Sequence, residues 1–139
     1  MMLPRQVKTL REIKFRGIST DEKVWIYGNL LISQNPRHNF ETLIIPQEKC
    51  NSYMAIIPST VGQYTGLKDR QGVEIYEGDV LDYDNGIGIK GIVKWYEDGF
   101  AIGILGAGDA SNKSLYQSTE DIEVIGNIHE NPELLKEGE

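Results

Sequence analysis

Apolar and polar residues alternate with a period of two along most of this 139-residue chain, and short groups of turn-forming residues separate the alternating runs. Successive side chains of a β-strand point to opposite faces of a sheet, so this pattern is typical of antiparallel strands with one buried face. The sequence therefore predicts an all-β protein.

The first sixty residues predict an antiparallel β-meander. Its alternating runs are residues 11–16, 23–33, 42–45 and 53–57. In the first run we expect Ile13 and Phe15 to face inward and Lys14 and Arg16 to face water. The last two runs are each followed by a proline, which cannot donate a hydrogen bond to a central ladder. Short strands leave sheet edges that a second copy could cover, so the sequence is compatible with a homo-oligomer.

Residues 61–139 predict a second region made of shorter strands and tighter turns. Its runs are residues 73–76, 80–84, 88–96, 100–105, 115–118 and 121–128. Closure removes sheet edges, so such strands favour a small, partly open barrel. In the run 88–96 we expect Val93 and Trp95 to lie inside and Tyr96 outside. The segment Asn131-Pro132-Glu133 predicts a short helical turn near the C-terminus.

The stretch from Gly62 to Gly86 is rich in glycine and carboxylates, and it could be a site or a scaffold. It lacks the spacing of a phosphate-binding loop, and Gly72 instead suits a turn with a positive φ. Residues 82–86 resemble a calcium loop, but Asn85-Gly86 is a favoured hairpin turn and no glutamate closes the loop. An acid/base pair could be drawn from the carboxylates, but alternation scatters them over both faces; they are Glu74, Glu77, Asp79 and Asp82. The sequence favours a scaffold.

Cysteine and histidine are too scarce to predict a metal site, a cofactor site or a catalytic site. The only cysteine is Cys50, and the only histidines are His38 and His129. A single thiol forms no internal disulfide, and nothing local supports Cys50 and His38 as a nucleophile and its base. The sequence as given shows neither the apolar segment of a signal peptide nor a membrane span. We expect a cytoplasmic protein that is not an enzyme.

Charge is distributed unevenly along the chain. Residues 1–17 carry a net charge of +4, whereas residues 67–139 contain six basic and sixteen acidic side chains. A strongly acidic region repels phosphate backbones, which disfavours nucleic acid as a partner of the C-terminal part. The basic N-terminal strand could still contact nucleic acid, and this candidate basic face consists of Lys8, Arg11, Lys14 and Arg16.

Aromatic side chains are concentrated in the predicted barrel. Most of these rings must build its core, but alternation leaves Tyr83, Tyr96 and Tyr116 as candidates for an exposed strip that binds a partner. Because acidic residues surround the strip, we expect it to favour a basic peptide or a basic protein surface over a phosphate backbone.

Four blocks of the sequence resemble the YopX family of phage and prophage proteins from Gram-positive bacteria. In chain order they are REIKFRG with VWIYG, TVGQYTGLKDRQGVEIYEGDVL, GIVKWYEDGF and EVIGNIHENPELL. The resemblance implies an SH3-like β-barrel in residues 61–139 and the cytosol of a bacterial host. It supplies no catalytic residue, because the family has no established biochemical activity.

Together, these observations predict an N-terminal β-meander followed by an SH3-like barrel and a non-enzymatic role in binding a host or phage protein. Two alternatives remain open. One is an adaptor that binds nucleic acid through the basic N-terminal strand. The other is an acidic mimic of DNA that occupies a basic protein.

Overall fold

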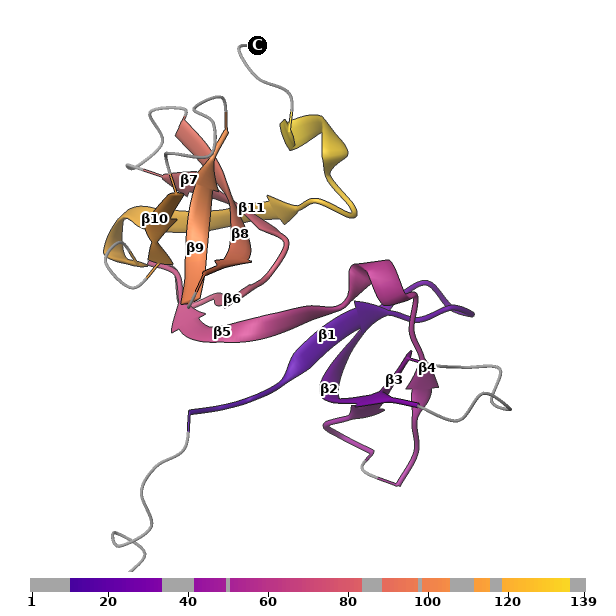
Figure 1. Cartoon of the computed structure of the whole chain (residues 1–139). Helices are drawn as coiled ribbons and strands as arrows, with labels where there is room; N and C mark the ends of the chain where they lie inside the picture. The colour runs from indigo at the N-terminus through magenta and orange to yellow at the C-terminus, as the bar shows by residue number, and fades with distance from the viewer. Residues whose placement is uncertain are drawn as a thin grey trace, which may run out of the picture.

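The computed structural model describes residues 11–33, 42–49, 51–83, 89–97, 99–105, 112–115 and 119–135. This part of the chain consists of antiparallel strands, turns and short 3₁₀ helices, and it contains no α-helix. The predicted all-β class is therefore confirmed. Figure 1 shows two groups of strands, with β5 running between them.

The first sheet has six strands in the order β4-β3-β2-β1-β5-β6. Their bounds are β1 Phe15–Ile18, β2 Trp25–Ile32, β3 Thr42–Pro46, β4 Met54–Ala55, β5 Gly62–Lys68 and β6 Glu74–Tyr76. The 3₁₀ helix η2, Pro58–Thr60, connects β4 to β5. This sheet continues across the predicted division at residue 60, because Arg16 of β1 pairs with Gly62 of β5. The assignment of 1–60 and 61–139 as separate domains stays a prediction.

The second sheet has five strands in the order β10-β9-β8-β7-β11. Their bounds are β7 Asp79–Tyr83, β8 Ile89–Tyr96, β9 Gly99–Ile104, β10 Asn112–Ser114 and β11 Ile122–Asn127. The 3₁₀ helix η5, Thr119–Asp121, leads into β11, and η6, Pro132–Leu135, follows it as the predicted C-terminal turn. Strand β10 precedes the predicted run 115–118, of which only Leu115 is described. The strand order gives two open antiparallel sheets, and barrel closure stays a prediction.

The main hydrophobic core lies on the inner face of the second sheet and includes Ile75 of β6. Its buried members are Ile75, Leu81, Val93, Phe100, Ile102, Leu115 and Ile122. Removing one such aliphatic side chain from water contributes roughly 1.5–3 kcal/mol. Because Ile75 belongs to the six-stranded sheet, this core joins β6 to the second sheet.

The glycine-rich and acidic stretch acts largely as a scaffold. Oδ1 of Asp69 accepts hydrogen bonds from the backbone N–H groups of Gln71 and Val73, and its Oδ2 accepts one from Val124 of β11. Gly72 has the predicted positive φ, 84°. The Asp69 carboxylate thus closes its own turn and ties that turn to the edge of the second sheet. The predicted Asn85-Gly86 turn lies outside the described residues.

The predicted inner face of the first run was wrong, and one side chain predicted to lie inside is exposed. In the first strand Lys14 and Arg16 are buried, with Arg16 only 6% exposed, whereas Ile13 is 55% exposed. The alternation is present but its inner face is the charged one, because acidic and aromatic partners receive both cations. Trp95 shares the face of Val93, as expected, but it lies near the end of β8 and is 52% exposed.

Candidate functional site

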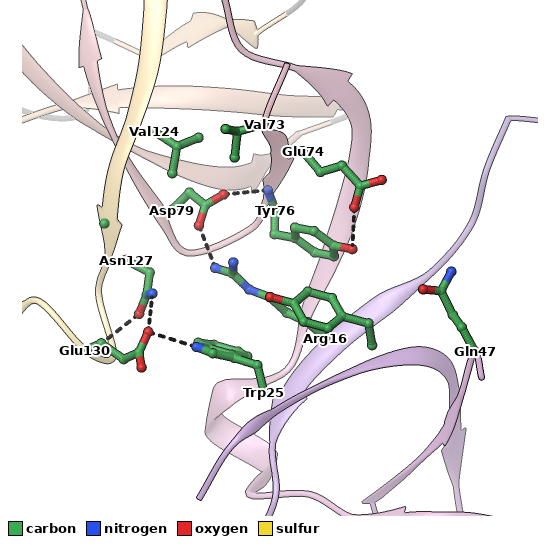
Figure 2. A pocket seen from close by; sticks show the side chains of 12 residues that line it. Arg16, Trp25, Gln47, Val73, Glu74, Tyr76, Asp79, Val124, Asn127 and Glu130 are labelled. Atoms are coloured by element: carbon green, nitrogen blue, oxygen red, sulfur yellow. Dashed lines mark hydrogen bonds and ion pairs between the residues drawn. The ribbon is translucent and has the colours of Figure 1, made fainter. Parts of the chain in front are cut away.

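A guanidinium group lies at the centre of the contact between the two sheets. The Arg16 guanidinium carbon lies 4.4 Å from the ring centre of Trp25 and 4.9 Å from that of Tyr76. Its Nη2 donates to Oδ1 of Asp79 at 2.7 Å and contacts the carbonyl oxygen of Glu77 at 3.4 Å. Cation–π contacts and a charge-assisted hydrogen bond thus hold the Arg16 side chain in place. Figure 2 shows Arg16 with Trp25, Tyr76 and Asp79 around it.

Asp79 is the acidic partner of Arg16 and is 1% exposed. Its second oxygen, Oδ2, accepts a hydrogen bond of 2.8 Å from the backbone N–H of Tyr76. Burial raises the pKa of the Asp79 carboxyl, and the positive charge of Arg16 together with these hydrogen bonds opposes that shift. The Arg16 Nε–H is the one buried side-chain polar atom of the described chain that has no hydrogen-bond partner.

A second hydrogen-bond network joins β2 to the loop after β11. The indole N–H of Trp25 donates to Oε1 of Glu130 at 2.8 Å, and the side-chain amide of Asn127 donates to the same oxygen at 3.0 Å. These two hydrogen bonds, led by the one from Trp25, lower the pKa of Glu130. The ring of Trp25 also meets His129 edge-on at 6.0 Å, and burial lowers the pKa of that imidazole. The described geometry therefore keeps Glu130 ionised and favours neutral His129 at neutral pH.

A second buried cation, Lys14, lies two residues before Arg16 in the chain. The Lys14 ammonium is 2.7 Å from Oε2 of Glu74, 3.0 Å from Glu12 and 4.9 Å from the ring centre of Tyr64. Burial acts to lower the pKa of Lys14, but its bonds and charge interactions with the two glutamates outweigh burial and raise it. The other oxygen of Glu74 accepts a hydrogen bond from the hydroxyl of Tyr76, so both of its oxygens are occupied.

These side chains surround a cavity of about 470 Å³ between the two sheets. Its lining comes from β1, β2 and the turn after β3 (Arg16, Trp25, Tyr27 and Gln47), from the segment of β6 and β7 (Val73, Glu74, Tyr76 and Asp79), and from β11 and the loop after it (Val124, Gly126, Asn127 and Glu130). The volume lies in the range typical of ligand pockets. Aromatic walls, a few convergent polar groups and shifted pKa values make this cavity the candidate functional site.

The predicted tyrosine strip is not assembled among the described residues. Tyr83 pairs with Ile89 at the start of β8, whereas Tyr96 lies at the end of the same strand. Seven residues separate the two ends, about 23 Å in an extended strand, and an odd separation places Tyr83 and Tyr96 on opposite faces. Tyr83 packs against the core, Tyr96 is exposed, and Tyr116 lies outside the described residues.

The predicted basic face is also divided. Arg11 is exposed, Lys14 and Arg16 are buried in ion pairs, and Lys8 lies outside the described residues. The charges of Lys14 and Arg16 are therefore directed at acidic side chains of the same chain. Within the described ranges, no three His, Cys, Asp or Glu side chains gather in a way that could hold a metal ion, and no helix is long and apolar enough to cross a membrane.

Sequence reasoning did not single out Trp25, Asn127 or Glu130 as site residues. The available signal was that VWIYG and EVIGNIHENPELL are two of the blocks that carry the family resemblance. The structure brings residues of both to the same cavity as Arg16 of REIKFRG and Asp79 of TVGQYTGLKDRQGVEIYEGDVL.

Comparison with known proteins found a family and a solved structure that are similar to this chain. The family model described as YopX protein matches residues 14–136. Among solved structures, protein EF1440 from Enterococcus faecalis is similar, with 28% sequence identity and a TM-score of 0.56 over 91% of this chain and 100% of that one. No curated protein matches the chain. Because the family match spans nearly the whole sequence, the chain belongs to the YopX protein family.

Proposed function

We propose that this chain is an accessory protein, encoded by a phage or prophage, that acts in the host cytoplasm as a non-enzymatic protein-binding module. The observation that carries the proposal is the cavity of about 470 Å³ at the contact between the two sheets. Tyr27 and Val73 line it and are 39% and 47% exposed, so apolar surface reaches solvent at its mouth. Exposed apolar surface with polar groups around it is typical of a protein-binding site.

The same geometry supports a binding role more than a catalytic one. Both oxygens of Asp79 and both oxygens of Glu74 are engaged by groups of this chain. A carboxylate held by fixed donors positions structure, whereas a general base must reach the proton that it removes. The cavity thus offers surfaces and hydrogen-bonding groups for recognition.

We further propose that the second sheet forms the SH3-like barrel of this module. The meander β7-β8-β9-β10 is followed by the 3₁₀ helix η5, and β11 then returns to pair with β7 at the start of the meander. This return makes β10 and β11 the two edge strands of the sheet, and it is their approach that would close a small barrel.

A capture experiment with matched tyrosine variants tests the binding role. A tagged chain is used to recover proteins from host lysate, with and without nuclease and at low and high salt. Tyr27→Ala alters the cavity mouth, and Tyr53→Ala is its control because Tyr53 is 64% exposed and does not line the cavity. We expect one nuclease-resistant protein that Tyr27→Ala loses and Tyr53→Ala retains. Equal recovery by both variants, or material that disappears with nuclease, would contradict the proposal.

The acidic-mimic alternative involves the same kind of partner and is tested with the same material. The described surface carries many exposed acidic side chains, among them Glu22, Glu97, Glu120 and Glu133. If the chain occupies a DNA-binding surface, added duplex DNA should displace the captured protein. Retention of the protein in the presence of DNA favours the binding module.

A further inference from the structure

Two cations of this chain occupy the same kind of environment, an aromatic face combined with a carboxylate. Lys14 lies over Tyr64 and pairs with Glu74. Arg16 lies between two rings and pairs with Asp79. Aromatic faces attract cations through their quadrupole, and a nearby carboxylate adds charge-assisted hydrogen bonds.

The outer part of the cavity offers the same two groups, an aromatic ring and a carboxylate. Tyr27 presents its exposed ring there, and Glu130 is an exposed carboxylate of the same lining. Oε1 of Glu130 accepts hydrogen bonds from Trp25 and Asn127, which fixes the carboxylate in place. Within the described chain, Oε2 of Glu130 has no ion-pair partner and no cation lies over the ring of Tyr27.

The charge of the lining selects a cation. Among the charged residues of the lining, Asp79 is paired with Arg16, and Glu74 is paired with Lys14 from outside the lining. Glu130 is the lining carboxylate without an ion-pair partner in the described chain, so the lining keeps a net negative charge. The whole chain has a net charge of −7, which adds a long-range attraction for cations. The pKa of Glu130 is lowered, which keeps this carboxylate charged at neutral pH.

We propose that the outer part of this cavity receives the guanidinium of an arginine from a partner protein, stacked on Tyr27 and hydrogen-bonded to Glu130. This inference rests on the proposed binding function and names the chemistry of the partner. A guanidinium is planar, so it can stack on the ring and present a fork of donors to a carboxylate at the same time. A phosphate or carboxylate group would instead meet a lining of net negative charge.

The two tryptophans provide a direct readout of this binding. The indole N–H of Trp25 donates to Glu130, whereas the exposed Trp95 of β8 does not line the cavity. The probe is the peptide acetyl-Gly-Arg-Gly-amide, and its control carries citrulline, which has nearly the same shape and no charge. In ¹H–¹⁵N NMR titrations we expect the arginine peptide at millimolar concentration to shift the Trp25 indole signal and to leave that of Trp95 in place. We expect the citrulline peptide to bind about fivefold more weakly.

Charge variants locate the interaction at Glu130. Glu130→Gln retains an acceptor for Trp25 and removes the charge, so we expect arginine binding to weaken by about threefold. Glu120→Gln makes the same change in net charge at an exposed position outside the lining, and should bind as the wild type does. Equal binding of both peptides, an unchanged Trp25 signal, or equal affinity of the two variants would overturn the inference.

The test separates this inference from the function on which it rests. If Tyr27→Ala abolishes capture of the partner while the arginine peptide leaves the Trp25 signal unchanged, the cavity binds its partner through other chemistry. The arginine inference is then wrong and the binding role stands. If neither experiment detects binding at the cavity, both proposals are wrong.

Discussion

Arg16 of β1 and Asp79 of β7 form a buried ion pair, with Nη2 2.7 Å from Oδ1, that joins the six-stranded sheet to the five-stranded sheet. The two residues are separated by 63 positions in the sequence. Removing two charges from water is costly, and their attraction offsets that cost only with good geometry and further hydrogen bonds. Here the backbone N–H of Tyr76 and two aromatic faces supply those additional contacts.

Removal of Arg16 should strongly destabilise the fold. Arg16→Met keeps an apolar stem but leaves Asp79 buried without its cation, which costs about 3 kcal/mol of unfolding free energy at neutral pH. Urea unfolding measures the difference. The control is Glu123→Gln, which breaks the half-exposed pair of Glu123 with Arg70 and should cost less than about 1 kcal/mol. Equal losses in the two variants would contradict a structural role for the buried pair.

The cost of removing Arg16 should decrease as the pH falls. Burial raises the pKa of Asp79 above its ordinary value of 3.8, and Arg16 opposes this rise. A carboxyl with a raised folded-state pKa contributes stability that is present below its unfolded-state pKa and is lost as the pH rises through the folded-state pKa. Without Arg16 the pKa of Asp79 rises further. The variant therefore loses more unfolding free energy than the wild type does as the pH rises to neutral.

Urea unfolding of the wild type and Arg16→Met between pH 7 and about pH 4 tests this dependence. The difference in unfolding free energy between the wild type and Arg16→Met should become smaller toward the acidic end of this pH range. The double variant Arg16→Met with Asp79→Asn lacks the titrating group and should be more stable than Arg16→Met at neutral pH. A gap that stays constant with pH would show that Asp79 does not titrate as expected.

The strands were predictable from the sequence, but the buried face of the first one was not. Alternation gives the period of a strand but does not say which face is buried. Because apolar residues usually lie in the interior, Ile13 was predicted to be buried, and Lys14 and Arg16 to face water. That preference failed because Glu74 and Asp79, more than fifty residues away in the sequence, pair with the two cations. A local pattern carries no information on such long-range partners.

The indole N–H of Trp25 should control the acidity of Glu130. Trp25→Phe keeps an aromatic face for Arg16 and removes the donor, so the lowered pKa of Glu130 should rise toward its ordinary value of 4.5. A carboxyl with a lowered folded-state pKa stabilises the fold at pH values above its unfolded-state pKa, and this stability is lost as the pH falls through the folded-state pKa. The Trp25→Phe variant should lack this contribution. Carboxyl NMR titration of Glu130 measures the shift. The same titration in Trp95→Phe should match that of the wild type, and a Glu130 pKa unchanged in Trp25→Phe would exclude the hydrogen bond as its cause.

Trp95 should contribute less to stability than its size predicts. Although it meets Phe100 edge-on at 4.9 Å, half of its side chain reaches solvent at the end of β8. We therefore expect Trp95→Ala to cost about 1 kcal/mol, against about 3 kcal/mol for Ile102→Ala at a fully buried position. Thermal unfolding ranks the two variants, and a larger drop in midpoint for Trp95→Ala would place its ring in the core.

The candidate site was less predictable than the fold because its parts come from distant blocks. The sequence indicated the blocks that contain Arg16, Trp25, Asp79 and Glu130, through the family resemblance, but not that they meet. Their meeting depends on β5, which pairs with β1 on one side and β6 on the other and so brings Asp79 next to the first sheet. Two members of the predicted tyrosine strip, Tyr83 and Tyr96, are not brought together by the described strands. The two residues are near each other in the sequence, but they lie at opposite ends of the neighbouring strands β7 and β8.

The glycine of VWIYG should be required by close packing between strands. A β-carbon on Gly28 would overlap the carbonyl oxygen of Ile45 on β3, and backbone cannot move aside as a flexible side chain can. We expect Gly28→Ala to cost at least about 2 kcal/mol, in the range of overpacked interiors. Gly99→Ala is the matched control, because a β-carbon there meets no atom within 4 Å and the change should be neutral or slightly stabilising. Chemical unfolding of the two variants measures the difference, and equal stabilities would mean that β2 and β3 separate readily enough to accept the methyl group. Since β2 also carries Trp25 and Tyr27, such a separation would move the walls of the cavity, so the Gly28→Ala variant should shift the Trp25 indole signal as well.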